Sequence, residues 1–368
     1  MKTILHLIDT TGPGGAETVF INLLNELEGT DFRNVVVLRG EGWVADQVRE
    51  VGIEPHFVDS KGSFNLGYIR ALRRLLMDED VDLIHAHLLG SNVYGALLAL
   101  LARKPMIATF HGSVDVASRE RFLRAKFSII GWGASAIVCV SKGLQEQLSQ
   151  RSPLPSRKLN LIFNGVDPER FSEAPATGLR EELGLPPEAK LVVSIGNIRP
   201  AKGYEYLVDA AVEMAARDPL KHFVVVGHQR ASLFNELNER ISRAWKTPNI
   251  HWLGFRQDVE SILRQADIFL LPSSSEGFSI STVEAMMARV PIIATRSGGP
   301  EEILVDGITG ILIPTKDSDA IAGAIEKLDD SVLRERLTEK ARADALQRFS
   351  LQIMLQEYKG LYERLFRG

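Results

Sequence analysis

The stretch Pro272-Ser273-Ser274-Ser275-Glu276-Gly277-Phe278-Ser279-Ile280-Ser281-Thr282-Val283-Glu284-Ala285-Met286-Met287-Ala288-Arg289 lies between two apolar runs, residues 268–271 and 291–295. Both runs are predicted to be buried strands, and the segment between them ends in a helix. A polar, glycine-containing turn between a strand and a helix is where open α/β sheets bind ligands. The start of the helix offers free backbone N–H groups, and the positive end of its dipole, to a phosphate.

Two carboxylates occupy this stretch, Glu276 in the turn and Glu284 in the helix. An ionised carboxylate only accepts hydrogen bonds, so both side chains suit hydroxyl groups and neither suits a phosphate. A segment that offers backbone amides to a phosphate and carboxylates to hydroxyl groups predicts a binding site for a sugar nucleotide. A structural interpretation of Glu284 stays open, because Ser281-Thr282-Val283-Glu284 also has the S-x-x-E spacing of a capping box.

Composition narrows the class of protein. The chain has 368 residues, enough for two domains or one large one, and its 45% hydrophobic and 24% charged fractions are typical of a soluble globular protein. The net charge of −4 argues against a nucleic-acid binder. The single cysteine, Cys139, lies in an apolar run and is predicted to be a small buried hydrophobe. The first residues read as a strand rather than a signal peptide, and no 18-residue apolar segment is present, so a cytoplasmic protein is expected.

Apolar runs alternate with helix-period segments along the chain, and this pattern occurs twice. Continuous Val/Ile/Leu runs suit strands that helices cover on both faces, which indicates parallel sheets. The polar stretch 172–178 reads as a linker. We therefore predict an α/β protein with two Rossmann-like domains, 1–171 and 172–350, facing a central cleft. The predicted strands are 4–8, 35–38, 81–85, 105–110, 136–140, 160–163, 191–195, 222–226, 250–253, 268–271, 291–295 and 310–313, and helices are predicted at 16–27 and 66–77.

The loop after the first predicted strand, residues 10–17, contains Gly14 and Gly15. Glycines let the backbone approach a phosphate closely and place the helix start beside it. The loop is not G-x-G-x-x-G, and no acidic residue follows the second strand in the position expected for a dinucleotide ribose, so NAD binding is disfavoured. A glycine-rich turn without a ligand is the structural alternative.

Three histidines follow or end predicted strands. His85 and His87 form an H-x-H pattern, and alternate residues of a strand point to one face. No third His, Cys or acidic ligand is placed nearby in the sequence, so no metal site is predicted, and the pair is expected to line the cleft. His111 comes directly after the strand 105–110.

The second domain opens with a strand that ends in a glycine turn, Gly196-Asn197, followed by the cations Arg199 and Lys202. A diphosphate leaving group gains charge as the sugar departs, so fixed cations stabilise the transition state more than the ground state. The only acidic cluster resembling a metal-binding D-x-D, residues 78–80, sits at a helix end rather than after a strand. We therefore expect the protein to be independent of metal.

Residues 119–132 combine four cations with large apolar residues such as Phe122, Phe127 and Trp132. This combination is typical of a helix that lies on an anionic membrane surface. The alternative is a helix that packs on the sheet and leaves a solvated basic face.

These motifs together resemble a known family. Glu276 and Glu284, with seven residues between them, match the E-x7-E signature of GT4-type retaining glycosyltransferases, the glycosyl transferase group 1 family. The match extends nearly the whole chain, through the GGAE loop 14–17, the H-x-H strand, the NGVD turn 164–167 and the Gly298-Gly299-Pro300 turn. The resemblance implies the GT-B fold, a UDP- or GDP-sugar donor in the second domain, and a saccharide or lipid-linked acceptor in the first. It also implies a role in cell-surface polysaccharide or glycolipid synthesis, and that the helix 351–368 packs back on the first domain.

The resemblance assigns roles residue by residue. Glu276 would orient the sugar ring, Glu284 would accept hydrogen bonds from the ribose hydroxyls, and His111 would contact the sugar. The family usually has Gly-Arg where this chain has Gly196-Asn197, so Lys202 is the firmer partner of the diphosphate and the role of Arg199 is open. The remaining donor contacts are expected from Gly277, Phe278, Ser279, Gly227, Phe255, Gly14 and Gly15.

Two other classes of function stay open at this point. One is a nucleotide-sugar epimerase or hydrolase built on the same plan, and the other is a non-catalytic nucleotide-sugar-binding protein. Retention normally indicates a double displacement by a carboxylate near the anomeric carbon, whereas the family is thought to use front-face attack. The sequence does not decide between these mechanisms.

Overall fold

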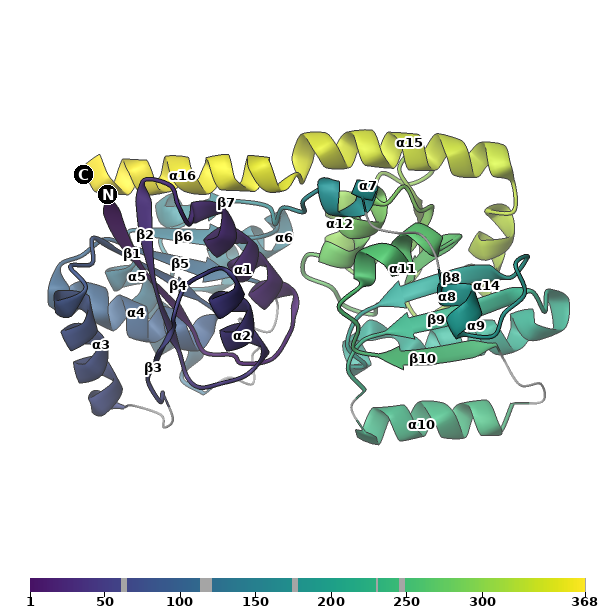
Figure 1. The fold of residues 1–368 in the computed structure, drawn as a ribbon, viewed down its shortest axis with the longest axis horizontal. Helices are drawn as coiled ribbons and strands as arrows, with labels where there is room; N and C mark the ends of the chain where they lie inside the picture. Colours follow the sequence, from purple (N-terminus) through teal and green to yellow (C-terminus); the bar gives the residue numbers. More distant parts are fainter. Residues whose placement is uncertain (61–64, 113–120, 174–177, 230, 245–248, 368) are drawn as a thin grey trace. The chain divides into compact units, whose positions relative to one another are not determined.

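A computed structural model describes residues 1–367 apart from 61–64, 113–120, 174–177, 230 and 245–248. The chain divides into two compact units (Figure 1). Unit 1 comprises Met1–Gly165 and Leu351–Gly368, and unit 2 comprises Val166–Ser350. The last helix is therefore part of unit 1, although it follows unit 2 in the sequence.

Unit 1 is built on a parallel sheet, which among the described residues has seven strands in the order β3-β2-β1-β4-β5-β6-β7. The strands are β1 (Lys2–Ile8), β2 (Phe32–Leu38), β3 (His56–Phe57), β4 (Leu83–His87), β5 (Met106–Phe110), β6 (Ala136–Cys139) and β7 (Leu159–Leu161). The helices are α1 (Gly15–Leu27), α2 (Trp43–Glu50), α3 (Leu66–Asp78), α4 (Leu89–Ala102), α5 (Leu123–Gly133), α6 (Lys142–Arg151) and α16 (Leu351–Arg367), with a 3₁₀ turn η2 (Ser156–Lys158).

Both faces of this sheet are covered, as the continuous apolar runs predict. On one face α4 approaches so closely that a Cβ added to its Gly95 would lie 3.1 Å from Cβ of Ala86 in β4. On the other face the ring of Phe20, from α1, packs against the rings of His6 and His87. Alternate residues of β1 and β4 therefore point into different layers of the core.

Helix α16 closes unit 1 with an apolar face that includes Met354, Tyr358 and Tyr362. The Tyr362 ring packs against Phe32 at the start of β2, with 5.6 Å between ring centroids. The Tyr362 hydroxyl reaches His85 in β4. The helix is therefore attached to the sheet by both apolar and polar contacts.

Unit 2 repeats the architecture with six described parallel strands in the order β10-β9-β8-β11-β12-β13. They are β8 (Lys190–Ile195), β9 (Lys221–Val226), β10 (Ile250–Gly254), β11 (Ile268–Leu271), β12 (Ile292–Thr295) and β13 (Ile311–Ile313). The helices are α7 (Glu169–Glu173), α8 (Leu179–Glu182), α9 (Tyr204–Arg217), α10 (Ala231–Ser242), α11 (Val259–Gln265), α12 (Ile280–Met287), α13 (Gly299–Ile303), α14 (Ser318–Lys327) and α15 (Ser331–Arg348), with a 3₁₀ turn η3 (Pro200–Lys202).

The predicted fold, two Rossmann-like parallel sheets, is confirmed, although several strand bounds differ; β2, for example, begins at Phe32 rather than at 35. β4 runs from Leu83 to His87 rather than over 81–85, because the Val81 amide bonds to Leu76 O and still closes the end of α3. The sequence also missed β3, whose two residues are too few to form a recognisable apolar pattern.

The strand order places a topological switch point in each unit. In unit 1, β1 lies beside β4, and the chain continues from β1 to β2 on one side and from β4 to β5 on the other. In unit 2, β8 lies beside β11, and the chain continues from β8 to β9 on one side and from β11 to β12 on the other. Open α/β sheets bind ligands beyond the carboxyl ends of the strands at such points. In unit 2 the switch point brings together the loops that follow β8 and β11.

Candidate functional site

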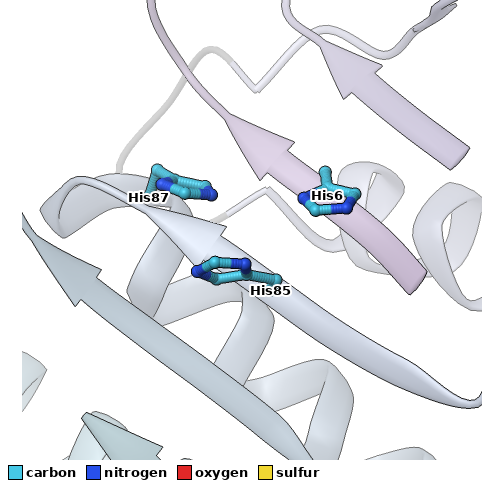
Figure 2. A group of neighbouring side chains, drawn as sticks. All are labelled: His6, His85 and His87. Carbon is cyan, nitrogen blue, oxygen red and sulfur yellow. The ribbon is translucent and has the colours of Figure 1, made fainter. Parts of the chain in front are cut away.

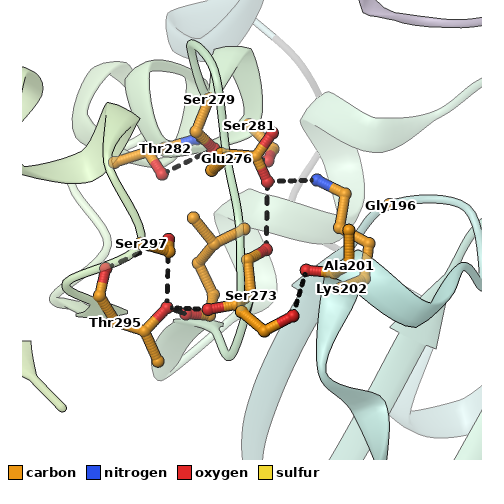
Figure 3. Close-up of polar contacts among 12 residues, drawn as sticks. Gly196, Ala201, Lys202, Ser273, Glu276, Ser279, Ser281, Thr282, Thr295 and Ser297 are labelled. Carbon is orange, nitrogen blue, oxygen red and sulfur yellow. Dashed lines mark hydrogen bonds and ion pairs between the residues drawn. The ribbon is translucent and has the colours of Figure 1, made fainter. Parts of the chain in front are cut away.

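The loop between β11 and α12 is clamped on both sides by backbone hydrogen bonds. The Ser274 amide donates to Ala201 O, in the loop after β8, at 2.8 Å. The Glu276 amide donates to Ser297 O, in the loop after β12, at 2.9 Å, and Glu276 O accepts from the Gly299 amide at 3.0 Å. The loop is therefore held in one conformation by the two neighbouring loops (Figure 3).

The Glu276 carboxylate meets Lys202 at the centre of this arrangement (Figure 3). Lys202 Nζ lies 2.7 Å from Glu276 Oε2, and the Ser273 hydroxyl donates to the same oxygen at 3.0 Å. The two charged side chains are only 21% and 14% exposed, so their attraction is less screened than that of a surface pair. The structure thus brings together Glu276 and Lys202, which lie far apart in the sequence.

Gly196 lies beneath the Lys202 side chain. A Cβ added at Gly196 would lie 3.1 Å from Lys202 Cε, and Gly196 O accepts a hydrogen bond from the Tyr204 hydroxyl at 2.7 Å. The Asn197 side chain connects the loops after β8 and β9, because its Oδ1 accepts a hydrogen bond from the His228 amide at 2.9 Å. Arg199 is exposed at the start of η3.

Gly227, at the end of β9, packs directly on the Gly196 backbone. A Cβ at this position would lie 2.2 Å from Gly196 O, so a larger residue would force the two loops apart. Beside it the rings of His228 and Phe255 stack, with 4.8 Å between centroids and 4° between planes. The Phe255 ring is 38% exposed and offers a flat aromatic surface at the ends of β9 and β10.

Two residues just before α12 have different roles: Ser279 caps the helix, and the Phe278 side chain is buried. Ser279 is the N-cap, and its hydroxyl accepts from the Thr282 amide at 3.3 Å. Phe278 is buried and packs edge-on against Phe349, with 5.7 Å between centroids. The Phe278 side chain therefore belongs to the core of unit 2, and any donor contact at this residue would come from its backbone.

The capping-box interpretation of Glu284 is wrong. Because Ser279 caps the helix and Ile280 begins it, Glu284 lies in the second turn rather than at the third helical position. Burial raises the pKa of Glu284 to about 7, while Arg170 acts to lower it and Glu260 to raise it. Helix capping therefore does not explain Glu284, a residue that the structure leaves only partly exposed.

In unit 1, the H-x-H residues do point to one face, with 4.2 Å between the ring centroids of His85 and His87. His87 Nδ1 lies 3.1 Å from His111 Nε2, so the three predicted histidines form one cluster. His6, which the sequence did not single out, joins them from β1 (Figure 2). Burial lowers the pKa of His6 and of His111 to about 4, so these imidazoles are neutral near pH 7.

In the glycine loop after β1, the Glu17 carboxylate lies close to the backbone of Gly14. Gly14 caps α1, and a Cβ added there would lie 2.4 Å from Glu17 Oε2. A side chain at position 14 would therefore require the flexible Glu17 side chain to move. Gly15 begins α1. Both glycines belong to unit 1, whereas the clamped loop belongs to unit 2.

The predicted basic helix lies partly outside the described residues, which exclude 113–120. Its described part, α5, buries Phe127 and Ile130 in unit 1 and leaves Phe122 and Trp132 exposed. Across the described part of the chain, none of the helices has both the length and the apolar character needed to span a bilayer.

Three residues at these sites escaped the sequence reasoning, namely Ser273, Tyr204 and His6. Ser273 and Tyr204 act through hydrogen bonds to Glu276 and Gly196, which a local pattern does not reveal. His6 was hidden in an apolar strand. The signal that could have found it is a histidine in the otherwise apolar run 4–8.

Comparison with known proteins gives a consistent result. Residues 13–170 match the family described as Glycosyltransferase Family 4, and residues 177–344 match Glycosyl transferases group 1. The chain is 27% identical over 324 residues to alpha-D-kanosaminyltransferase of Streptomyces kanamyceticus, covering 83% of each protein. It is 26% identical over 302 residues to UDP-Gal:alpha-D-GlcNAc-diphosphoundecaprenol alpha-1,3-galactosyltransferase of Escherichia coli, covering 79% of this chain and 78% of that protein.

Among solved structures, the Anabaena protein Alr3699/HepE in complex with UDP and glucose superposes with a TM-score of 0.88 at 23% identity, covering 99% of this chain and 100% of that one. This likeness supports the GT-B fold. The two family matches lie side by side and together span most of the sequence. The chain belongs to the GT4-type glycosyltransferases.

Proposed function

We propose that this glycosyltransferase moves a sugar from a UDP- or GDP-sugar to a saccharide or lipid-linked acceptor, with retention of anomeric configuration. The expected setting is cell-surface polysaccharide or glycolipid synthesis in the cytoplasm. The observation that carries the proposal is the Glu276–Lys202 pair, with 2.7 Å between Oε2 and Nζ, at the switch point of unit 2. The pair places a carboxylate, which accepts hydrogen bonds from hydroxyl groups, beside a fixed cation, as a sugar diphosphate requires.

The pair suggests how unit 2 acts on the donor. Lys202 neutralises the charge that develops on the diphosphate as the bond to the sugar breaks. Glu276, oriented by Ser273, accepts hydrogen bonds from a sugar hydroxyl and holds the ring. Glu284 accepts hydrogen bonds from the ribose, and the amides of Gly277 and Ser279 face the phosphates.

The base is assigned to the aromatic pair at the ends of β9 and β10. Phe255 and His228 stack on each other, and Phe255 is 38% exposed, so this pair could offer a nucleobase the same kind of contact. Names of similar proteins support the choice of donor and acceptor. HepE was crystallised with UDP and glucose, and the Escherichia coli relative is named for a UDP-Gal donor and a diphosphoundecaprenol-linked acceptor.

In unit 1, His111 is proposed to contact the sugar and the Gly14-Gly15 loop to face the phosphate or the acceptor. We further propose that the exposed Phe122 and Trp132 flank a surface that contacts anionic lipid. Sedimentation with anionic vesicles at low salt, weakened as salt rises, would support that contact. Absence of binding at low salt would eliminate it.

The donor is tested by melting the protein with a panel of UDP-, GDP- and ADP-sugars without added metal. A ligand that binds only the folded protein raises Tm by mass action, so one nucleotide class should stand out. Lys202→Ala should abolish that shift, because the diphosphate loses its cation. A panel without any shift, in a protein that melts cooperatively, would contradict the assigned donor site. Donor turnover without an acceptor would indicate a hydrolase instead.

A further inference from the structure

The buried histidine cluster of unit 1 has more ligand-like atoms than the proposed transfer reaction uses. His6, His85 and His87 each offer one ring nitrogen, and these three atoms all lie within 4.8 Å of one another (Figure 2). The register of β1 and β4 produces this grouping, because His6 is paired with His85 and Ile8 with His87. All three histidine side chains are fully buried.

Two ring nitrogens of these histidines have no hydrogen-bond partner among the described residues. Among the described residues, neither His6 Nδ1 nor His87 Nε2 makes a hydrogen bond, although both are buried. Buried polar atoms are nearly always paired, so two unpaired ring nitrogens in one histidine cluster need an explanation.

The hydrogen bonds around His6 determine which of its nitrogens carries the proton. Asn34 Nδ2 donates to Glu28 Oε2 at 3.0 Å, so the Asn34 carbonyl oxygen must face the other way. That oxygen lies 3.1 Å from His6 Nε2, which must therefore carry the proton. His6 Nδ1 is left with its lone pair, the form in which imidazole binds a metal. The Glu28-Asn34-His6 chain also resembles the outer partners that orient metal-binding histidines.

His87 and His85 complete the set. His87 Nδ1 lies 3.1 Å from His111 Nε2, and when His87 donates this hydrogen bond its Nε2 presents a lone pair. His85 contacts the Tyr362 hydroxyl through Nδ1 and the Thr109 hydroxyl through Nε2, each at 2.8 Å. For Nε2 to bind an ion, the Thr109 side chain must turn to another rotamer that moves its oxygen away.

We propose that His6, His85 and His87 form a buried site for a zinc-class divalent cation in unit 1. Imidazole nitrogens suit Zn²⁺, Co²⁺, Ni²⁺ and Cu²⁺, whereas Mg²⁺ and Ca²⁺ need oxygen ligands. Zn–N bonds of about 2.0–2.1 Å place tetrahedral ligands about 3.4 Å apart, so the rings must close by about 1 Å. A water or hydroxide completes the coordination. The ion links β1 to β4 and, through Tyr362 and His111, reaches α16 and the end of β5.

The test is metal binding by the purified full chain, which does not depend on transfer activity. After exhaustive chelation, Zn²⁺ is titrated against a competing chromophoric chelator, and Co²⁺ binding is followed through its visible absorption. We expect one ion per chain, and a rise in Tm of about 5–10 °C at zinc concentrations a hundredfold above Kd. Less than about a tenth of an equivalent of Zn²⁺ bound by the wild-type chain would overturn the proposal.

Two variants remove one ligand each and keep the neighbouring hydrogen bond. His6→Gln retains a donor toward Asn34, and His87→Asn retains a nitrogen toward His111. Each should weaken Zn²⁺ binding at least about a hundredfold. The matched control is His251→Gln, which alters a partly buried histidine contact of unit 2, His222 Nδ1 to His251 Nε2 at 3.0 Å.

The control should bind Zn²⁺ like the wild type. Unchanged binding in both ligand variants, or loss of binding in the control, would place the ion elsewhere and overturn the proposal. If a ligand variant fails to fold, X-ray absorption of the wild-type zinc complex decides instead. Three imidazole neighbours support the site, and a first shell without them refutes it.

Discussion

Replacing Glu276 by alanine tests the central pair of unit 2 directly. The change removes the carboxylate whose Oε2 lies 2.7 Å from Lys202 Nζ and 3.0 Å from the Ser273 hydroxyl. Hydrogen bonds to charged groups contribute about 1.5–3 kcal/mol each, and a partly buried lysine left without its partner adds a desolvation cost. If Glu276 orients the sugar, transfer should fall at least about a hundredfold, which corresponds to about 2.7 kcal/mol.

The same change lowers the stability of unit 2, so activity and folding must be measured together. A loss of about 2 kcal/mol would lower Tm by roughly 4–8 °C for a unit of this size. The matched control is Asp329→Ala, which removes the carboxylate 2.7 Å from Nζ of the buried Lys221 in the same unit. Because Asp329 is 58% exposed and Lys221 keeps Asp218 at 3.2 Å, this control should lose less stability than Glu276→Ala and keep its rate of transfer.

The assay is initial-rate transfer from the donor that the melting panel identifies, at a temperature where all three proteins are folded. A rate for Glu276→Ala within about threefold of the wild type would remove Glu276 from the site. Equal losses of transfer in Glu276→Ala and Asp329→Ala would show that the effect comes from folding rather than from sugar positioning.

Three further predictions follow from the same structure. Gly227→Ala should weaken nucleotide binding at least about tenfold, because the new Cβ would lie 2.2 Å from Gly196 O. The control is Gly323→Ala, a position with open space around it. Equal nucleotide affinities of the two variants, measured by calorimetry, would refute the reasoning. Burial raises the pKa of Glu284 from 4.5 to about 7, so the folded protein holds this proton more tightly than the unfolded one. Its contribution to stability should therefore fall as pH rises from about 4.5 through about 7, while nucleotide affinity should rise as the carboxylate ionises. Glu284→Gln should flatten the pH dependence of affinity, and a wild-type profile in that variant would exclude Glu284 as its source. Transfer should persist in excess chelator, since Lys202 serves the diphosphate; loss of transfer that Mg²⁺ or Mn²⁺ restores would contradict this.

Local sequence patterns were sufficient for the fold because burial acts on each strand separately. Continuous apolar runs such as 268–271 and 291–295 appear where helices cover both faces of a strand, and β11 and β12 lie there. The pattern fails where other forces decide the boundary. Val81 is apolar, yet its amide closes α3 instead of joining β4.

Patterns with a fixed spacing were also informative about the candidate site. The H-x-H residues share a face because strand side chains alternate, and the rings of His85 and His87 lie beside each other. The capping box failed because S-x-x-E recurs by chance on helices. The cap that formed uses Ser279, since the clamped loop sets where α12 begins.

The sequence by itself therefore determined the fold class, the family, and which loops carry polar groups at strand ends. These properties depend on neighbouring residues and on short spacings, of which the eight positions from Glu276 to Glu284 are an example. The tertiary structure alone decided that Lys202 meets Glu276, that Phe278 turns into the core, and that His6 joins the H-x-H pair. Such contacts depend on which strands become neighbours. Strand order is set by the packing of the whole sheet. A contact between residues that lie far apart in the chain therefore produces no pattern in the local sequence around either residue.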